Sequence, residues 1–492
     1  MLFLKLQRLG VKGLFYNNIK AIYKSITYMV KVAGGYLTPI LSRIGLKQGG
    51  ILSSLLFNIY IDDIKQIFDP SCDPVNFLNN PLSHLLYADD MIMMSISQTG
   101  LNNCLKKLET YCDTWHLEVN ITKTEIVIFN SSGKILQGYN FEYKGQYLKI
   151  VNSYCYLGVD ISTSNSLTLA RTNLVEKAKK ACFPLQSAIS QFNIPCKNAI
   201  NLYHSYIKPI ATYNSEILAQ LSKHQIKSIE SGRSNLITYL TQSITDKVHN
   251  KFLKFLLGVK RNCSNMATLG EVGELPLLYH GLVQMLSYWH RTSLMNDETL
   301  VKQALNFVME NGTEESEWLL SVKFILNLIQ MNDIYNNPSS MSGKAFKENC
   351  SGKLKELLIE QWKYSINVDT STNGQRNKLR IYKQFKQSFR FEEYLTYIKD
   401  FHSRRVVTRF RCSDHTLEIE RGRHKKVKLE KRLCKMCKSN IESEMHFLQE
   451  CPCYTTLRYK FFGTMQHNFY IDIQSGREKV SRKKYPVKLL LF

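Results

Sequence analysis

The spacing of apolar residues predicts helices and strands in the first part of the chain. From Leu4 to Val32 apolar positions recur at helical spacing among lysines and asparagines, which predicts helices that feed a core. Residues 45–64 pass from a glycine turn into a strongly apolar helix whose first turn contains two serines. Residues 83–97 consist of two short apolar runs around Asp89 and Asp90, which predicts a tight hairpin with acids at its tip.

Strand-like sequence continues after this hairpin, and helical sequence follows it. Residues 115–129 end in a β-rich run, and residues 153–162 predict another strand. From about 167 to 330 the pattern is predominantly helical. Polar, turn-forming residues at 331–343 are the best linker candidate, and residues 370–377 are the second. The fold class that follows is α+β.

The composition describes a globular and strongly basic protein. Hydrophobic residues make up 44% and aromatic residues 11% of the 492, so the chain can bury enough surface to offset its conformational entropy. Collagen, a short disulfide scaffold and a wholly disordered chain are excluded. The formal net charge of +24 favours a polyanion such as nucleic acid as partner, with a merely soluble basic protein as the alternative. Between Arg376 and Lys438, 20 basic residues stand against 7 acids, which concentrates the charge.

Cysteine usage and the absence of long apolar runs indicate a reducing compartment. The 13 cysteines are odd in number, mostly lie far apart and come without a secretory signal, so a disulfide framework is not expected. The opening decapeptide MLFLKLQRLG interrupts its apolar run with charge. No stretch reaches the 18 or so apolar residues that span a bilayer. We therefore expect a soluble, intracellular protein with no membrane partner.

The acidic pair in Tyr87-Ala88-Asp89-Asp90 has the chemistry of a magnesium site. Two adjacent carboxylates repel each other, and a divalent cation that neutralises them stabilises the arrangement. Hard oxygen ligands select Mg²⁺, and two such ions can clamp the attacking and leaving oxygens of a phosphoryl transfer. The alternative for so short a motif is an ordinary acidic turn between strands.

Three further motifs stand in order around this pair. GLKQGGILSSLLFN at 45–58 precedes it, and WHLEVNITKT at 115–124 and YLGVDI at 156–161 follow it. The ordered set resembles the palm of a reverse transcriptase of the non-LTR (LINE-type) retrotransposon family, matching its motifs B, C, D and E in turn. Residues near 208–219 and 257–277 resemble the connecting region downstream of the polymerase in these elements.

The resemblance implies roles for individual residues. Asp89 would be the main magnesium ligand and Asp90 its companion, and Lys123 would be the cation near the pyrophosphate leaving group. The remaining family positions would bind nucleotide or template, or grip the primer. The nucleotide- and template-binding positions are Gln48, Gly49, Tyr87 and Ala88, and the primer-grip positions are Leu157 and Gly158. Without the resemblance, the glycines would be plain turn residues and Lys123 a solvated charge.

One expected carboxylate is absent. The two-ion mechanism of this family uses a further aspartate, in motif A, on a strand that precedes motif B. The first 61 residues contain no Asp or Glu, and Asp62 and Asp63 would emerge at the far end of the motif B helix. We therefore expect a truncated palm, without motif A and the fingers, in which polymerase activity is lost or nearly lost.

A second constellation lies near the C-terminus. Cys434 and Cys437 form a Cys-x₂-Cys pair, and His446 and Cys451 follow. Such a pair presents two thiolates in a tight knuckle, and the following His and Cys complete a tetrahedral Zn²⁺ site. The alternative is chance clustering of free thiols. The pattern also resembles the CCHC element that follows the polymerase in non-LTR retrotransposons.

The basic segment before this element resembles its usual lead-in. We expect its cations to contact phosphates and to give salt-dependent affinity with little sequence choice. The alternative is a solvated basic face. The residues concerned are Arg409, Arg411, Arg421, Arg423, Lys425 and Lys426.

These observations combine into four expected regions: a partial palm at 1–165, a helical thumb and connecting region at 166–330, a linker and helical region at 331–400, and a basic zinc-binding tail at 401–492. The resemblance implies a fragment of an RNA-directed DNA polymerase with RNA template, DNA primer or target and dNTPs as partners. The alternative is a non-catalytic, zinc-containing nucleic-acid-binding relic. The resemblance also implies the nucleus, with the cytoplasm as the alternative. The sequence does not indicate an oligomeric state.

Overall fold

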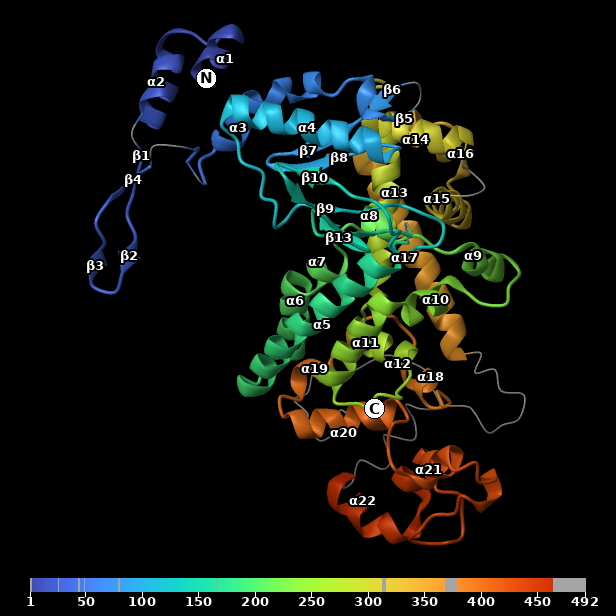
Figure 1. Cartoon of the computed structure of the whole chain (residues 1–492). Coiled ribbons are helices and arrows are strands. Elements are labelled where there is room, and N and C mark those ends of the chain that lie inside the picture. Colours follow the sequence, from blue (N-terminus) through green and yellow to red (C-terminus); the bar gives the residue numbers. More distant parts are fainter. Residues whose placement is uncertain are drawn as a thin grey trace. The chain divides into compact units, whose positions relative to one another are not determined.

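The structure, a computed structural model, describes residues 2–24, 26–42, 45–47, 49–77, 80–164, 166–311, 316–367 and 378–462. The chain divides into two compact units, Met1–Ser166 and Leu167–Phe492 (Figure 1). The first unit combines helices with short strands, and the second is mostly helical. The predicted α+β class is confirmed.

The first unit begins with two helices and a β ribbon. The helices are α1 (Leu2–Arg8) and α2 (Gly13–Lys24), as the apolar spacing predicts. The helical prediction for 26–32 is wrong, because this stretch lies in β1 and β2. The ribbon has left-handed backbone at Gly34 and Gly35, which turns the chain back. Its strands are β1 (Ile26–Tyr28) paired with β4 (Ile40–Ser42), and β2 (Lys31–Val32) paired with β3 (Gly35–Tyr36).

The predicted apolar helix and the predicted acidic hairpin are both present. The helix is α3 (Ser53–Ile61), and the hairpin joins β7 (His84–Tyr87) to β8 (Asp90–Met93). Helix α4 (Gln98–Trp115) follows, and the Ser97 hydroxyl caps it by accepting from the Gly100 N–H at 2.9 Å. Between α3 and β7 lie the 3₁₀ helices η1 (Asp62–Ile67) and η2 (Pro70–Cys72) and the paired strands β5 (Val75–Phe77) and β6 (Asn80–Leu82).

The remaining strands of the first unit are short. The β-rich end of 115–129 narrows to a two-residue strand, and the predicted strand at 153–162 is a hairpin of two strands. The strands are β9 (Glu125–Ile126) parallel to β12 (Lys149–Ile150), β10 (Glu142–Tyr143) with β11 (Gln146–Tyr147), and β13 (Ser153–Tyr156) with β14 (Val159–Ser162). One face of α4 buries Leu105, Leu108 and Tyr111 in a core with Phe141 and Leu148.

The second unit packs its helices around one large apolar core. Its helices in chain order are α5 (Thr168–Gln191), α6 (Cys196–Tyr206), α7 (Lys208–Ala211), α8 (Ser215–Leu218), α9 (Lys223–Glu230), α10 (Leu236–Gln242), α11 (Ile244–Leu257), α12 (Asn265–Val272), α13 (Leu277–Ser293), α14 (Leu300–Asn311), α15 (Glu317–Leu328), α16 (Asn332–Asn336), η3 (Pro338–Ser340), α17 (Gly343–Asn367), α18 (Tyr382–Phe385), α19 (Tyr394–Tyr397), α20 (Phe401–Arg411), α21 (Glu418–His424), η4 (Leu429–Lys431), the π-helical turn η5 (His446–Glu450), η6 (Pro452–Tyr454) and α22 (Thr455–Phe462).

Large aromatic side chains hold this core together. Trp362 of α17 is fully buried, donates its indole N–H to the Met266 carbonyl at 2.9 Å and lies against Gly270, where a Cβ would collide with its ring. Trp289 of α13 is also fully buried. Residues 331–343 contain α16 and η3, whereas the linker candidate at 370–377 lies outside the described residues. The division into four regions stays a prediction.

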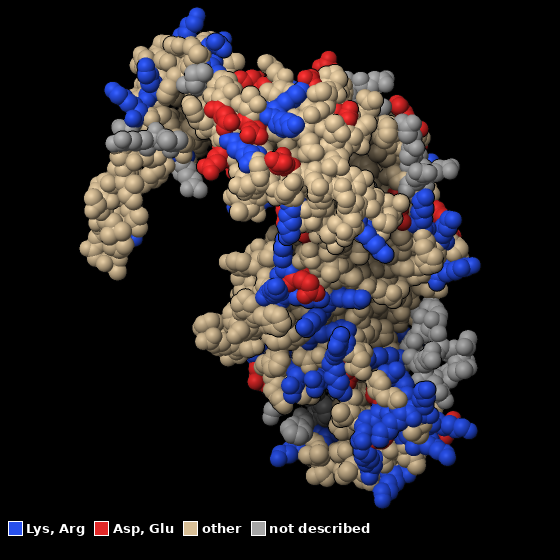
Figure 2. Space-filling view, viewed as in Figure 1, with Lys and Arg blue, Asp and Glu red and all other residues tan. Residues whose placement is uncertain are grey.

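Charge is distributed unevenly over the second unit. Figure 2 shows lysine and arginine side chains gathered over the end that carries α21 and α22.

Within the described ranges, no helix combines the length and the apolar character that a bilayer crossing requires.

Candidate functional site

The acidic pair lies at the tip of the β7–β8 hairpin. Tyr87 pairs with Asp90 at the end of the ladder, so Ala88 and Asp89 form a two-residue turn. Ala88 has φ +53°, a left-handed conformation that is unusual for a residue with a side chain. Asp89, Asp90 and Tyr87 are exposed. The tip therefore presents two adjacent carboxylates to solvent, where a hard cation can reach both.

One residue of the second hairpin, β13–β14, is close enough to this tip for an electrostatic interaction. Burial first, and then the negative charge of Asp90, raise the pKa of Tyr156, so this phenol at the end of β13 lies near the Asp90 carboxylate. Leu157 and Gly158 form the hairpin turn with φ +47° and +81°, the left-handed pair that a tight two-residue turn requires. The residue that precedes the predicted primer-grip turn is therefore influenced by the charge of the acidic pair. Tyr156 was not singled out from the sequence.

The loop before α3 contains two glycines, Gly49 and Gly50, at positions where another residue would be strained or would collide. Gly49 has φ +78° with open space around the position of a Cβ, so glycine is needed there for its conformation. At Gly50 a Cβ would lie 2.6 Å from the Ser53 Oγ, so the close packing occurs one residue later. The Ser53 hydroxyl donates to the Lys47 carbonyl at 2.5 Å, which ties the loop to the helix. Gln48 lies outside the described residues.

Asp63 lies just after the end of α3 and is bound by side chains of α1 and α4. Its Oδ1 accepts from the Lys5 Nζ at 2.8 Å and from the Tyr111 hydroxyl at 2.6 Å. Burial opposes its ionisation, but these hydrogen bonds outweigh burial and lower the pKa of Asp63. Lys5 also lies 3.7 Å from the centroid of the Trp115 ring. Asp63 therefore joins three helices of the first unit.

Lys123 lies in a turn that precedes β9. Its backbone N–H donates to the Asn120 side-chain oxygen at 3.2 Å, and the Thr124 hydroxyl donates to the Asn120 carbonyl at 2.9 Å. The Lys123 side chain is exposed. Asn120 thus fixes the turn that carries this cation.

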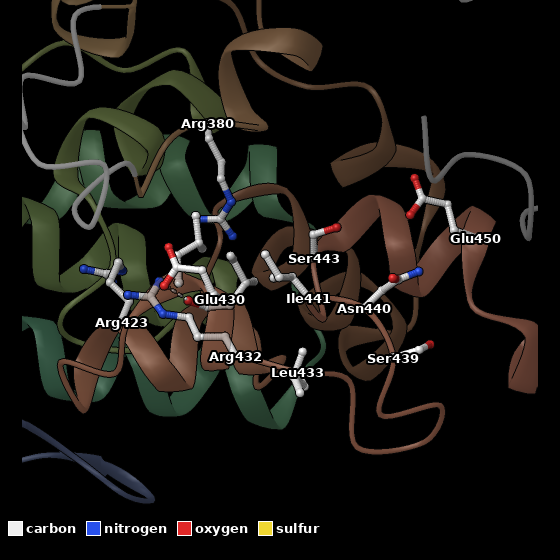
Figure 3. A pocket seen from close by; sticks show the side chains of 12 residues that line it. Arg380, Arg423, Glu430, Arg432, Leu433, Ser439, Asn440, Ile441, Ser443 and Glu450 are labelled. Atoms are coloured by element: carbon white, nitrogen blue, oxygen red, sulfur yellow. Dashed lines mark hydrogen bonds between the residues drawn. The ribbon is translucent and has the colours of Figure 1, made fainter.

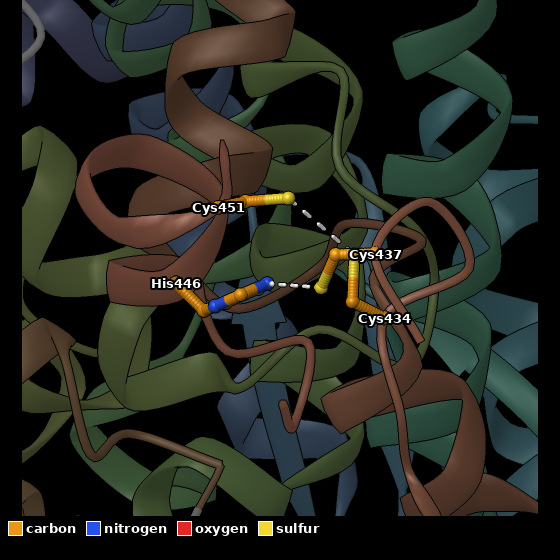
Figure 4. Close-up of side chains that lie close together, drawn as sticks. All are labelled: Cys434, Cys437, His446 and Cys451. Carbon is orange, nitrogen blue, oxygen red and sulfur yellow. Dashed lines mark hydrogen bonds between the residues drawn. The ribbon is translucent and has the colours of Figure 1, made fainter. Parts of the chain in front are cut away.

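The four predicted zinc ligands converge in the second unit. The donor atoms of Cys434, Cys437, His446 and Cys451 all lie within 4.8 Å of one another (Figure 4). The sulfurs of Cys434 and Cys451 are 3.9 Å apart, and the Cys437 sulfur is 3.3 Å from the His446 Nε2. A tetrahedron with metal–sulfur bonds of about 2.3 Å has edges of about 3.8 Å. Three sulfurs and one imidazole nitrogen at these separations could hold structural Zn²⁺.

Local hydrogen bonds shape the knuckle and its electrostatics. The Cys434 N–H donates to the Asn440 carbonyl at 2.8 Å, and the left-handed Lys438 closes the turn. Hydrogen bonds from the Ser439 hydroxyl, from backbone N–H groups and from His446 lower the pKa of Cys437 to about 5. Burial raises the pKa of Cys434. The Cys437 thiolate is thus favoured before any ion is considered.

The histidine of this cluster has a carboxylate behind it. His446 is buried, and its Nδ1 lies 3.6 Å from the Glu450 carboxylate while its Nε2 faces Cys437. Carboxylates that accept a hydrogen bond from the second ring nitrogen commonly orient zinc-binding histidines, and Glu450 lies just beyond hydrogen-bond distance of the His446 Nδ1. The sequence prediction missed Glu450 and Ser439, although Glu450 lies one turn after His446. Cys453 is exposed and does not belong to the cluster.

Among the predicted phosphate-binding residues, Arg411 and Arg423 are held by carboxylates. The prediction that Arg411 contacts phosphates is corrected by the structure. Its guanidinium is buried and pairs with Glu271, at 2.9 and 3.0 Å, and with Glu392, at 2.8 Å. Arg423 donates two hydrogen bonds to the buried Glu420 at 2.9 and 2.8 Å.

The other four predicted cations are more accessible. Arg409 is partly exposed and donates to the Gly258 carbonyl at 2.8 Å. Arg421 is exposed and pairs with Glu418 at 3.2 Å. Lys425 and Lys426 are exposed. The exposed basic surface is therefore smaller than the charge run suggests.

Comparisons with known proteins agree with the motifs of the first unit. Residues 3–161 match the family model described as reverse transcriptase (RNA-dependent DNA polymerase). The Drosophila melanogaster protein named "Probable RNA-directed DNA polymerase from transposon BS" is 30% identical over 118 residues, which are 22% of this chain and 12% of that protein. The match thus spans a small part of that relative. The resemblance to a retrotransposon reverse transcriptase is thus confirmed, and the family match covers residues 3–161.

Proposed function

We propose that the first unit is built for RNA-templated DNA synthesis with Mg²⁺ held by Asp89 and Asp90. The observation that carries the proposal is the hairpin tip, which exposes both carboxylates within the matched residues 3–161. Bound Mg²⁺ would neutralise charge on the phosphates of a dNTP and on the primer end. Both aspartates therefore act as metal ligands, with Asp89 as the main one.

The other predicted residues bind the nucleic acid or the nucleotide in this proposal. Ala88 and Tyr87 lie next to the incoming nucleotide, and Lys123 neutralises the leaving pyrophosphate. Gln48 and Gly49 position the template and nucleotide, and Leu157 and Gly158 grip the primer. What supports these roles is the position of each residue in its family motif, and, for the primer grip, the closeness of Tyr156 to Asp90.

We further propose that residues 1–492 have little polymerase activity by themselves. No carboxylate precedes Asp62 in the sequence, and Asp63 is committed to Lys5 and Tyr111. Asp89 and Asp90 alone would be one carboxylate fewer than the resemblance implies for a two-ion site. The same observation favours the second candidate function, a zinc-containing nucleic-acid-binding protein without catalysis.

Primer extension separates the two candidates. The full chain is given an RNA template, a DNA primer, dNTPs and Mg²⁺, and Asp89→Asn is compared with Asp62→Asn as a matched control. Asp62 is exposed and pairs only weakly with Lys65 at 3.6 Å. Extension that disappears in Asp89→Asn and persists in Asp62→Asn supports the enzyme. Extension that both variants retain equally contradicts the assignment of Asp89, and no extension with intact template binding supports the second candidate.

We propose that Cys434, Cys437, His446 and Cys451 bind one structural Zn²⁺. Elemental analysis of the purified full chain should give about one zinc per chain. Cys437→Ser should lower that ratio, and Cys453→Ser, which changes an exposed thiol outside the cluster, should not. A folded, metal-free chain would refute the zinc assignment.

The basic surface next to the zinc element would bind nucleic-acid phosphates through Arg409, Arg421, Lys425 and Lys426. This proposal fits an element of the LINE type, a target in the nucleus, and RNA and DNA as partners. Binding that does not weaken between about 50 and 200 mM salt would contradict it.

A further inference from the structure

A cavity of about 630 Å³ lies beside the zinc cluster in the second unit (Figure 3). Its volume is within the range of about 300–1,000 Å³ typical of ligand sites. Residues from α21, η4, the knuckle and the π-helical turn line it, together with Arg380. None of the four zinc ligands belongs to the lining.

Part of the cavity lining is apolar. Ile419, Leu429, Leu433 and Ile441 contribute aliphatic side chains to it. Leu433 remains 42% exposed although it lies between the buried Arg432 and Cys434. An aliphatic side chain that stays open at the edge of a cavity is available to pack against a flat, apolar ligand.

Arginine side chains also line the cavity. Arg380 and Arg423 are paired with the buried Glu420, and Arg380 also pairs with Glu444. Arg432 differs from these two arginines in having no ion pair with a carboxylate among the described residues. Its guanidinium donates instead to the backbone carbonyls of Val427 and Ile419.

Acceptors complete the lining. Glu430 and Glu450 are exposed carboxylates of the cavity wall, and the knuckle adds the exposed side chains of Ser439 and Asn440. Donors and acceptors at the edge of an apolar surface match the edge and the face of a nucleobase.

Exposed lysines lie next to the lining residues in the sequence. They lie on the turns on either side of η4 and on the knuckle itself, and within 425–438 they outnumber the single acid, Glu430. A strand whose base entered the cavity would have its phosphates within reach of such a surface. The exposed lysines are Lys425, Lys426, Lys428, Lys431, Lys435 and Lys438.

We propose that this cavity binds an unpaired base of a single-stranded nucleic acid, with the base against Leu433 and its edge toward the polar wall. A base in a duplex is stacked and paired, so its face and its pairing edge are not available to a cavity of this kind. The inference rests on the proposed nucleic-acid binding of the basic surface and adds a preference for single strands to it.

The test compares single-stranded and duplex RNA on the full, zinc-loaded chain. Fluorescence anisotropy measures Kd for a strand of about ten nucleotides and for its blunt duplex at about 150 mM salt. Leu433→Ala removes the apolar contact, and Met436→Ala is the matched control, because Met436 is 57% exposed on the same knuckle and does not line the cavity. Zinc content and melting temperature verify that both variants are folded.

We expect Leu433→Ala to weaken single-strand binding about five- to tenfold and to leave duplex binding unchanged. Met436→Ala should change neither. A 2-aminopurine base within the single strand should also become brighter when the wild-type chain binds, because a base in the cavity is unstacked.

Two results overturn the inference in different ways. Equal affinity for both RNAs, with no effect of Leu433→Ala and no change of 2-aminopurine emission, refutes the cavity but leaves phosphate binding intact. If the wild-type chain binds neither RNA, the proposed function fails, and the cavity proposal fails with it.

Discussion

Replacement of Arg411 by methionine tests whether this arginine is structural. Arg411 ends α20, and its side chain is only 7% exposed. It makes a bidentate pair with Glu271, which is fully buried and also accepts from the Tyr394 hydroxyl at 2.6 Å. Arg411→Met keeps a side chain of similar length but leaves the Glu271 carboxylate buried without its cation.

The expected loss of stability is large. Removing one partner of a buried ion pair costs about 3–5 kcal/mol, because the remaining charge is uncompensated. Lys386 stays paired with Glu392, so the second carboxylate near Arg411 keeps a cation. With a urea dependence of about 4 kcal/mol per M for a unit of this size, the unfolding midpoint should fall by about 1 M.

Urea unfolding of the full chain, followed by tryptophan fluorescence, measures this change. Trp289 and Trp362 are fully buried in the core of the same unit and report its unfolding. Arg421→Met is the matched control, since Arg421 pairs with Glu418 on the surface, where an ion pair contributes about 0–1 kcal/mol. The control should unfold like the wild type.

The two substitutions should affect nucleic-acid binding in the opposite order to their effects on stability. Arg421→Met should reduce the slope of log K against log salt by about 0.9, and Arg411→Met should leave the slope unchanged under native conditions. If Arg411→Met unfolds at the wild-type midpoint and reduces the salt slope, Arg411 contacts phosphate and our reasoning about its burial is wrong.

Three further predictions concern the metal, the hairpin turn and pH. A chelator should lower the melting temperature of the wild-type chain, and of Cys437→Ser much less, in a fluorimetric melt; equal shifts would contradict the zinc site. Because Ala88 has φ +53°, Ala88→Gly should change the unfolding free energy of the first unit by less than about 1 kcal/mol, and Ala88→Val should lower it by about 1–3 kcal/mol in a urea titration. Burial, and then the neighbouring His204 and His280, lower the pKa of His249 to about 3, against about 6.5 in the unfolded chain. The unfolded chain therefore takes up a proton that the folded chain excludes, and the unfolding free energy should fall by about 2 kcal/mol between about pH 6.5 and 5; a His249→Phe variant with the same pH dependence would refute this.

The features that the sequence predicted well depend on residues close together in the chain. The β7–β8 hairpin follows from two apolar runs separated by a short acidic turn. The convergence of Cys434, Cys437, His446 and Cys451 follows from their spacing over 18 positions, because a knuckle and one following turn are enough to bring the donors together. In both cases local backbone geometry determines which side chains meet.

The features that the sequence did not predict depend on distant partners. Arg411 and Glu271 are 140 positions apart, and no periodicity in either segment indicates that they form a buried pair. Lys5 and Asp63 are 58 positions apart and meet only because α1 packs near the end of α3. The β-rich end of 115–129 forms only the two-residue strand β9, because its distant partner β12 pairs with it at only two positions. Tertiary packing, which single-sequence patterns do not encode, decides these outcomes.

For the same reason, a run of basic residues in the sequence does not show which of them lie on a binding surface. Arg423 and Lys425 are two positions apart and contribute equally to the net charge, but the Arg423 side chain is 17% exposed and binds Glu420, while Lys425 is exposed. A buried arginine orders the fold by neutralising a carboxylate, and it releases no counterions when nucleic acid binds. Phosphate affinity therefore follows the cations that remain exposed after folding. Within residues 421–438 these cations lie on α21, on the turns around η4 and on the knuckle.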